Sequence, residues 1–250
     1  MSQPVRIVSY NILNGGVGRA DPIAEVLLAQ RPDVVGLVEA DDAEVVGRVA
    51  WRLGFDVVTA EGRKGRTAAL LTRGRILQSS NLVPLMKGDR PRSFLLATVE
   101  LDGRELDVGV VHLTSKASDD NESRRERELK AILKATKPLR KAGRPHVLMG
   151  DFNAVSPAWH VHPEQLPPKV LPHYQANGQA IPRRAIGAVL DAGYADPHAD
   201  DATPSFTTSH PGLRVDYVFT HGCAASSAWV ETDRLADFAS DHRPVGIEVA

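Results

Sequence analysis

Polar residues of the kinds that bind metal ions or transfer protons follow several predicted strands of this chain, and in one case interrupt a strand. They are Asn11, Glu39, His112, Asp151 with Asn153, Asp216, and Asp241 with His242. Strand ends are rigid and often present side chains to one cleft. We therefore expect these residues, although widely separated in the sequence, to converge in a single pocket.

The oxygen-bearing residues of this set indicate a hard metal ion. Glu39 offers a carboxylate, and Asn11 and Asp241 are further candidates beside it. Oxygen ligands suit Mg²⁺ or Mn²⁺ better than Zn²⁺, and such a site leaves positions for water and phosphate. The sequence therefore predicts a magnesium site, with manganese as the alternative ion.

Two further stretches suggest acid–base groups and hydrogen-bond donors. Asp216 interrupts an apolar strand, so we expect it to point inward and to orient a histidine, whose basicity its charge would raise. In the sequence 150–153, Asp151 and Asn153 place a carboxylate and a carboxamide on one side of an extended turn. Both arrangements are typical of a polar catalytic site.

Each stretch also has a purely structural explanation when it is taken alone. Asn11 could form a turn, Glu39 a surface ion pair, and the sequence 150–153 an Asx-turn that leaves a strand. His112 ends an apolar run and could be a satisfied core histidine, while Asp216 could form a core salt bridge. Taken together, these structural explanations fail. Every polar stretch would have to arise independently, and still stand at the expected strand end and in the expected order along the chain.

The elements that must position these residues alternate at first and then form a β meander, mostly antiparallel. Predicted strands are Val5–Leu13, Asp33–Glu39, Ala68–Thr72, Ile76–Leu85, Ser93–Leu101, Leu106–Leu113, Val147–Gly150, Val215–Thr220, Ala228–Thr232 and Val245–Val249. Predicted helices begin at Asp21-Pro22 and cover Asp42–Leu53, about Asp120–Lys141 and Arg184–Ala192. The order predicts a four-layered α/β/β/α sandwich, in which two mixed β-sheets pack face to face with helices outside.

Helix boundaries have local signals. Asp21 is placed to cap the first helix, with Pro22 in its first turn and Pro32 beyond its end. Gly54 is expected to end the second helix, and Pro138 to break the last turn of the third.

Bulk composition indicates a soluble globular protein. The chain has 250 residues, 42% of them hydrophobic, and a formal net charge of −1, so it lacks the basic excess that would capture nucleic acid non-specifically. Cys223 is the only cysteine, which fits a reducing compartment. The sequence carries neither an export signal nor the ~20 apolar residues of a transmembrane segment. We expect a cytoplasmic monomer with one domain over residues 1–250.

The polar stretches together resemble the endonuclease/exonuclease/phosphatase family, the deoxyribonuclease I-like metal-dependent phosphoesterases. The matching pieces occur in the family's order over nearly the whole chain: Ser9-Tyr10-Asn11-Ile12, Leu37-Val38-Glu39, Val111-His112-Leu113, Gly150-Asp151-Phe152-Asn153, Arg214-Val215-Asp216-Tyr217 and Ser240-Asp241-His242-Arg243-Pro244-Val245. Val38 departs from the pattern, because many members have Gln there. This departure leaves the carboxylate of Glu39 in place and puts only a secondary hydrogen bond in doubt.

The resemblance implies a role for each residue. His242, held by Asp216, takes a proton or grips the phosphate, while Asp151 orients or deprotonates the attacking water. Which of His242 and Asp151 is the base stays open. Asn153 donates a hydrogen bond to a phosphoryl oxygen, and His112 stabilises charge or protonates the leaving group. These roles supply the parts that phosphate-ester hydrolysis needs beside a metal ion.

Three functions are compatible with the resemblance. The first is a Mg²⁺-dependent phosphodiesterase or nuclease that acts on nucleic acid or nucleotides, which rests on analogy. The second is a phosphatase for a small or lipid-linked phosphate, which the neutral charge favours over a long-duplex nuclease. The third is a catalytically inactive phosphate-binding scaffold. It is disfavoured because every position that the chemistry needs carries a suitable residue.

Two other regions could bear on the substrate. Arg63, Lys64 and Arg66, together with Arg90 and Arg92, could hold flanking phosphates or form solvated loops. The Pro-rich segment 156–183 could stack an aromatic residue on a base and bind metal through His-Val-His, or be a stiff insertion with incidental histidines. The arginines and glutamates of 122–128 alternate, so we expect surface ion pairs without function.

Overall fold

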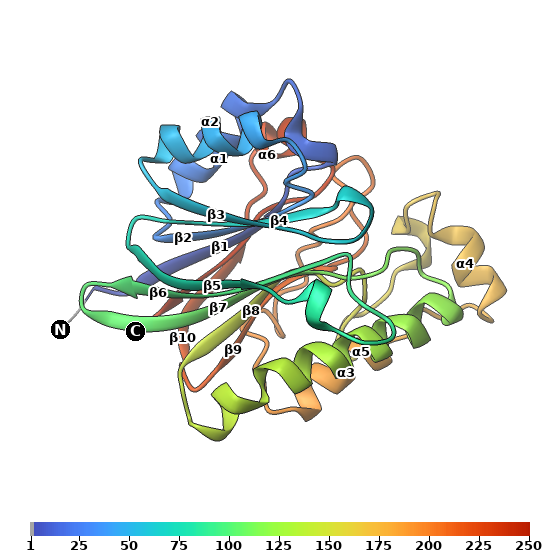
Figure 1. Cartoon of the computed structure of the whole chain (residues 1–250). Helices are drawn as coiled ribbons and strands as arrows, with labels where there is room; N and C mark the ends of the chain where they lie inside the picture. Colours follow the sequence, from blue (N-terminus) through green and yellow to red (C-terminus); the bar gives the residue numbers. More distant parts are fainter. Residues whose placement is uncertain (1–2) are drawn as a thin grey trace.

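The computed structural model describes residues 3–250 as two β-sheets enclosed by helices (Figure 1). The six-stranded sheet has the order β10 (Ala225–Val230), β11 (Val245–Val249), β1 (Val5–Asn11), β2 (Val34–Val38), β4 (Thr67–Thr72) and β3 (Asp56–Glu61). The five-stranded sheet has the order β5 (Arg75–Asn81), β6 (Ser93–Leu101), β7 (Arg104–His112), β8 (His146–Asp151) and β9 (Asp216–His221). Each sheet is mixed, because β1 and β2 pair in parallel and so do β7 and β8.

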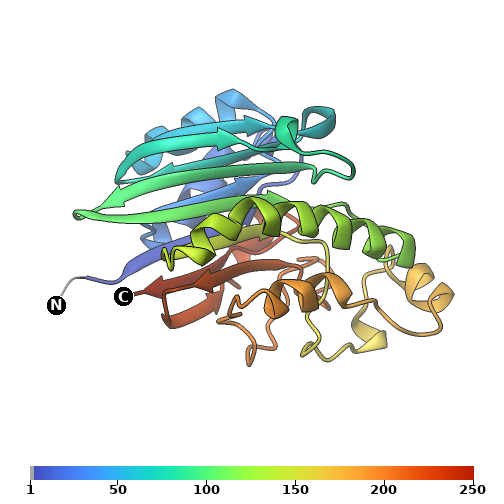
Figure 2. The ribbon, with the colours of Figure 1, turned by 60° about the horizontal axis from the view of Figure 1, so that its bottom comes forward.

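Helices cover the outer face of each sheet (Figures 1 and 2). The six-stranded sheet is covered by α1 (Ala20–Gln30), α2 (Ala43–Leu53) and α6 (Arg234–Ala239), and the five-stranded sheet by α3 (Asp119–Lys141) and α5 (Arg184–Asp191). The short helix α4 (Leu171–Ala176) lies in the Pro-rich segment, at the right of Figure 1. The predicted four-layered sandwich is therefore confirmed. Within residues 3–250, no helix is both long and apolar enough to cross a membrane.

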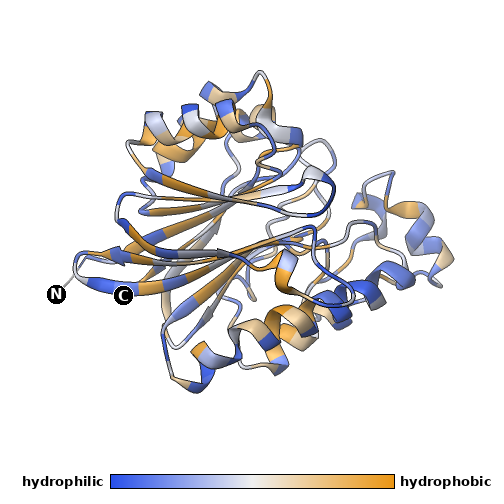
Figure 3. Cartoon of the chain, viewed as in Figure 1, coloured by the Kyte–Doolittle hydropathy of each residue, from blue (hydrophilic) through white to orange (hydrophobic). Residues whose placement is uncertain are grey.

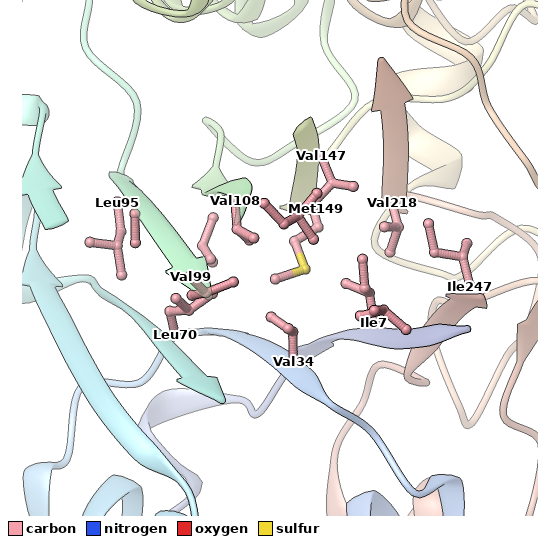
Figure 4. Packing of buried hydrophobic residues seen from close by; sticks show 14 of the residues in the cluster. Ile7, Val34, Leu70, Leu95, Val99, Val108, Val147, Met149, Val218 and Ile247 are labelled. Atoms are coloured by element: carbon pink, nitrogen blue, oxygen red, sulfur yellow. The ribbon is translucent and has the colours of Figure 1, made fainter. Parts of the chain in front are cut away.

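Three apolar layers hold these elements together. Figure 4 shows the central layer, in which Ile7 and Val34 of one sheet lie opposite Val108 and Met149 of the other. The next residue along β1, Val8, packs instead beneath the helices, as the two-residue period of a strand requires. Figure 3 shows the complementary pattern, with hydrophilic residues along much of α3. Strands with both faces covered are consequently rich in apolar residues on both faces, as in Val34–Val38 of β2.

Strand direction brings the polar residues to one edge of the sandwich. Asn11 pairs with Val38, and His112 pairs with Asp151, because both pairs of parallel strands end together. Asp216 pairs with Asp151 from an antiparallel strand, so it lies at the start of β9, not inside the strand as the sequence suggested. This edge is opposite the chain termini in Figure 1.

Several predicted boundaries were wrong for local reasons. The strand expected over residues 76–85 ends at Asn81, because a 3-10 turn containing Pro84 follows. Pro138 lies inside α3 and does not break it. Asp21 sits in the first turn of α1, where it pairs with Arg48 of α2 instead of capping the helix. Gly54, by contrast, ends α2 in a left-handed conformation, as predicted.

Candidate active site

Glu39 stands immediately after β2 and is held by neighbouring donors. Its Oε2 accepts a hydrogen bond from the backbone N–H of Asn14 at 2.8 Å and pairs with Arg66 at 2.9 Å. Its Oε1 lies 3.9 Å from a guanidinium nitrogen of Arg92 and 4.0 Å from His112 Nε2. The carboxylate is thus nearly buried and faces several cationic or hydrogen-bonding groups.

Asn11 ends β1 and joins two other site residues. Its Nδ2 donates to Asp151 Oδ2 at 3.0 Å and lies 3.4 Å from His242 Nε2. Its Oδ1 accepts from the backbone N–H of Leu13 at 3.0 Å, and its backbone carbonyl accepts from Ser240 at 2.6 Å. Asn11 therefore connects the end of β1 with the segment that carries His242.

Asp216 and His242 form a buried, hydrogen-bonded pair. The Nδ1 of His242 lies 2.8 Å from Asp216 Oδ2, which also accepts from the hydroxyl of Ser205 at 2.7 Å. Burial acts to lower the pKa of His242, but the charge and hydrogen bond of Asp216 outweigh it and raise the pKa to about 9. The imidazole is therefore held protonated, with its Nε2 directed toward Asp151 at 3.9 Å.

Asp151 ends β8 and lies between the two histidines. Its Oδ2 is 3.5 Å from His112 Nε2, and its Oδ1 accepts from the backbone N–H of Asn153 at 2.8 Å. Burial, with the charge of Asp216 second, raises the pKa of Asp151 to about 7. The carboxyl group therefore has the acid–base range that a proton-transfer residue needs.

The Asx-turn that the sequence left open for residues 150–153 is present, because Asp151 Oδ1 accepts from the backbone N–H of Asn153. Asn153 adopts a left-handed conformation with φ 48°, and its side chain donates to the Leu113 carbonyl at 3.2 Å. That bond uses one of its two amide N–H groups. The second N–H is available to a ligand.

His112 is fully buried at the end of β7. Its burial, followed by the charge of Arg92, lowers its pKa well below the usual value. Its Nε2 lies 3.3 Å from Arg92, and within residues 3–250 its Nδ1 has no hydrogen-bond partner. His112 is therefore neutral and can act by hydrogen bonding.

One pocket of about 340 Å³ collects most of the predicted residues. Glu39, His112, Asp151, Asn153, Asp241 and His242 line it. Asn11 and Asp216 lie behind this lining, where each contacts a residue that faces the pocket. Asp241 pairs with Lys169 at 3.5 Å, and its Oδ1 is 3.9 Å from His242 Nε2, so it belongs to the His242 side.

The Pro-rich segment supplies an apolar wall to this pocket. Val170 and Ile181 line it, together with Phe206, whose ring centre is 4.5 Å from that of His242. Trp159 is 8% exposed and packs in the apolar cluster beneath, which agrees with the stiff insertion that the sequence left open and not with stacking of this residue on a base. Among residues 3–250, the group of three or more possible metal ligands consists of Asp151, Asp216 and His242, and the histidines of His-Val-His are not part of it.

The prediction of surface pairs for the alternating charges of 122–128 is wrong for Glu122, Arg125 and Glu128, which are buried. Arg125 is 1% exposed and pairs with the buried Glu122 at 2.8 Å. It also donates to the carbonyls of Thr114 at 2.9 Å and Lys116 at 2.7 Å. Glu128, equally buried, accepts from the N–H and hydroxyl of Thr114. This network fixes the loop after His112, and a charge pattern alone does not reveal which side chains face inward.

Arg125→Leu is expected to lower the free energy of unfolding by about 3 kcal/mol, because it leaves the Glu122 charge and two carbonyls buried without their donor. Urea denaturation measures the change. Arg127→Leu, on the exposed face of the same helix where the arginine is 58% exposed, serves as the control and should change stability little. Equal stability of the two variants would contradict the buried role.

Comparison with known proteins agrees with this geometry. The family model described as "Endonuclease/Exonuclease/phosphatase family" matches residues 8–242. No curated protein matches the chain.

Solved structures share the fold. A 3′-5′ exonuclease (NExo) from Neisseria meningitidis is 22% identical with a TM-score of 0.74, over 98% of this chain and 99% of that one. A 3′ phosphatase NExo from Neisseria, bound to product DNA hairpin, is 21% identical with the same TM-score and coverage. An AP endonuclease from Archaeoglobus fulgidus is 20% identical with a TM-score of 0.69, over 97% and 98%.

Proposed function

The chain belongs to the endonuclease/exonuclease/phosphatase family of phosphoric ester hydrolases, and on this basis we propose that it hydrolyses phosphodiester bonds in nucleic acid or nucleotides with Mg²⁺. The observation that carries the proposal is the buried array in which Asp216 holds His242 and His242 faces Asp151. A protonated imidazole can bind a phosphoryl oxygen, and a carboxyl group with a raised pKa can accept a proton from water, so this pair supports phosphoester hydrolysis.

Glu39 is the main candidate for holding Mg²⁺, with Asn11 and Asp241 as further ligands. Arg66 and Arg92 already approach the carboxylate of Glu39, so this position attracts positive charge. The buried Oδ1 of Asp241 has no hydrogen-bond partner within residues 3–250, which fits a ligand role. Bound Mg²⁺ would supply positive charge to the phosphoryl oxygens and acidify a water molecule.

The alternative ligand group of Asp151, Asp216 and His242 fits a metal ion less well. Metal ligation needs a neutral histidine. The Nδ1 of His242 is already used by Asp216, whose charge raises the pKa of the ring and so disfavours the neutral form. We therefore assign these three residues to proton transfer and phosphate binding.

Each remaining residue has a role that its surroundings support. His242 grips a phosphoryl oxygen, and Asp151 receives a proton from the attacking water. Asn153 uses its second amide N–H on another phosphoryl oxygen. His112 is neutral, so we assign it hydrogen bonding to the developing charge, with Arg92 beside it, and not proton donation as an imidazolium.

A nuclease and a phosphatase differ in what they release. The Neisseria neighbour is described both as a 3′-5′ exonuclease and as a 3′ phosphatase, which keeps both reactions open for a similar site. The formal net charge of −1 gives the chain no basic excess for binding a long duplex, which favours a small or flexible substrate. The phosphatase is therefore the second candidate.

The test is a substrate panel with Mg²⁺ present and then chelated. We expect cleavage of single-stranded DNA, RNA or an abasic duplex into shorter products with Mg²⁺, and none after chelation. Release of inorganic phosphate from small phosphomonoesters alone would select the phosphatase. Glu39→Gln provides the metal control: its Mg²⁺ requirement should rise at least ~10-fold and its rate should recover partly at high Mg²⁺. Activity that persists in chelator would contradict the metal role.

A further inference from the structure

A second pocket, of about 290 Å³, opens beside the candidate active site and is lined mostly by basic side chains. Its lining consists of Arg63, Lys64, Arg66, Arg92, Thr114 and Arg124. Arg92 also lines the first pocket and lies 3.3 Å from His112 Nε2. Because β7, β8 and β9 are adjacent in that order, this basic pocket is on the His112 side of Asp151.

The basic pocket is built by four chain segments: the β3–β4 turn, the segment before β6 with Arg92, the loop after β7, and α3. The first two are fixed to each other. The turn between β3 and β4 carries Arg63 to Arg66, and the backbone N–H of Arg63 donates to the Arg92 carbonyl at 2.7 Å. Gly62 makes this approach possible, because a Cβ at this position would lie 1.9 Å from the same carbonyl oxygen. The arginines of both sheets are therefore held around one space, although the protein as a whole is nearly neutral.

Carboxylates offset only part of this charge. Arg66 pairs with Glu39, which we assign to the metal ion, and with Asp41. Arg124 lies 3.3 Å from Glu128 and 3.7 Å from Asp89, Arg63 lies 3.9 Å from Glu128, and Arg92 lies 3.9 Å from Glu39. The oxygens of Glu128 already accept two hydrogen bonds from Thr114. Within residues 3–250, Lys64 is exposed and makes no ion pair. The pocket therefore suits an anion with several oxygens, such as a phosphate, which arginine binds with paired donors.

We propose that the basic pocket binds a second phosphate of the substrate, one that is not hydrolysed and lies on the His112 side of the reacting phosphate. The inference rests on the proposed function, since it needs a phosphoester in the first pocket. The second phosphate has two possible sources. It is either the next phosphate of a polynucleotide or the second phosphate of a small bisphosphorylated compound.

The kinetic test compares substrates that differ by one phosphate. The dinucleotide TpT is compared with pTpT and TpTp, and thymidine monophosphates with thymidine 3′,5′-bisphosphate. We expect kcat/KM to be at least ~10-fold higher for a substrate with the additional phosphate, the factor expected for charge-assisted hydrogen bonds. Preference within the dinucleotides identifies a polynucleotide source, and preference within the mononucleotides a small one.

Variants connect the preference to the pocket. Lys64→Gln with Arg124→Gln should abolish the preference and leave the rate on the less phosphorylated substrate unchanged. Arg75→Gln with Lys130→Gln removes the same charge from exposed positions outside the pocket and should retain the preference. Lys64→Gln alone, at an exposed turn, should reduce the preference even if the double variant folds poorly.

A binding experiment separates this proposal from the proposed function. Thymidine 3′,5′-bisphosphate is titrated into the wild-type protein and the variants in chelator, by calorimetry. Affinity that falls about tenfold in Lys64→Gln/Arg124→Gln supports the pocket, even if the wild-type protein hydrolyses no nucleotide. Hydrolysis that shows no preference for the additional phosphate, or the same preference in all variants, overturns the pocket and leaves the function intact.

Discussion

Asp151→Asn is expected to lower kcat at least ~10²-fold with little change in folding. The carboxyl group lies between His112 and His242, is buried, and has a pKa raised to about 7. Asparagine keeps the size of the group but has one side-chain oxygen, so it can accept the hydrogen bond from Asn11 or the one from the backbone of Asn153, which use different oxygens of Asp151. The amide cannot receive a proton. Steady-state turnover on the cleaved substrate measures the effect, with the thermal midpoint as the check on folding.

The matched control for Asp151→Asn is Asp107→Asn. Asp107 is a buried carboxylate at the opposite end of the same sheet, where it pairs with Arg144 at 2.7 Å. Its replacement should reduce stability and leave kcat near the wild-type value. If Asp151→Asn turned over substrate at the wild-type rate, Asp151 could not be the proton acceptor, and the role would pass to another group.

The site residues could be predicted because each is tied to a strand end. A carboxylate or histidine after an apolar strand is costly unless it has a partner, so Glu39, His112 and Asp151 stand out in the sequence. The parallel pairing of β1 with β2 and of β7 with β8 then brings such ends together. The assigned chemistry of each residue remains a proposal, but their convergence was predictable.

Features made by helix packing were not predictable in the same way. Arg125 and its neighbours have the charge alternation of a surface helix, and only the position of α3 against the loop after His112 shows which side chains are buried. The short helices α4 and α6 are too short to give a periodic signal. Phe206 reaches His242 from a loop that has no pattern of its own.

The basic pocket could not be predicted from the sequence either. The sequence identifies Arg63, Lys64 and Arg66 as a cluster and Arg92 as another, but it cannot say that they face one space. That result depends on a close backbone contact between the β3–β4 turn and Arg92, which Gly62 permits. Contacts between sheets are long-range, so local patterns do not encode them.

Asp216→Asn is expected to lower kcat about 10³-fold, because Asp216 controls both the orientation and the charge of His242. Its Oδ2 accepts from His242 Nδ1 at 2.8 Å, and an amide at this position would remove the negative charge and could turn an N–H toward the ring. A neutral His242 would lose the positive charge with which it binds the phosphoryl oxygen. Ser205 would still hold the side chain through its hydroxyl, so the fold should persist.

Nuclear magnetic resonance of the His242 ring, recorded in chelator, separates this positioning role from a structural one. The charge of Asp216 raises the pKa of His242, so its removal must lower that pKa from about 9 and leave the ring neutral at physiological pH. Asp107→Asn, which does not contact His242, should leave the ring signals unchanged. A His242 that stays protonated at neutral pH in Asp216→Asn, with turnover near normal, would show that Asp216 only supports the strand. A lowered pKa together with the loss of turnover would tie phosphate binding to the charge that Asp216 maintains.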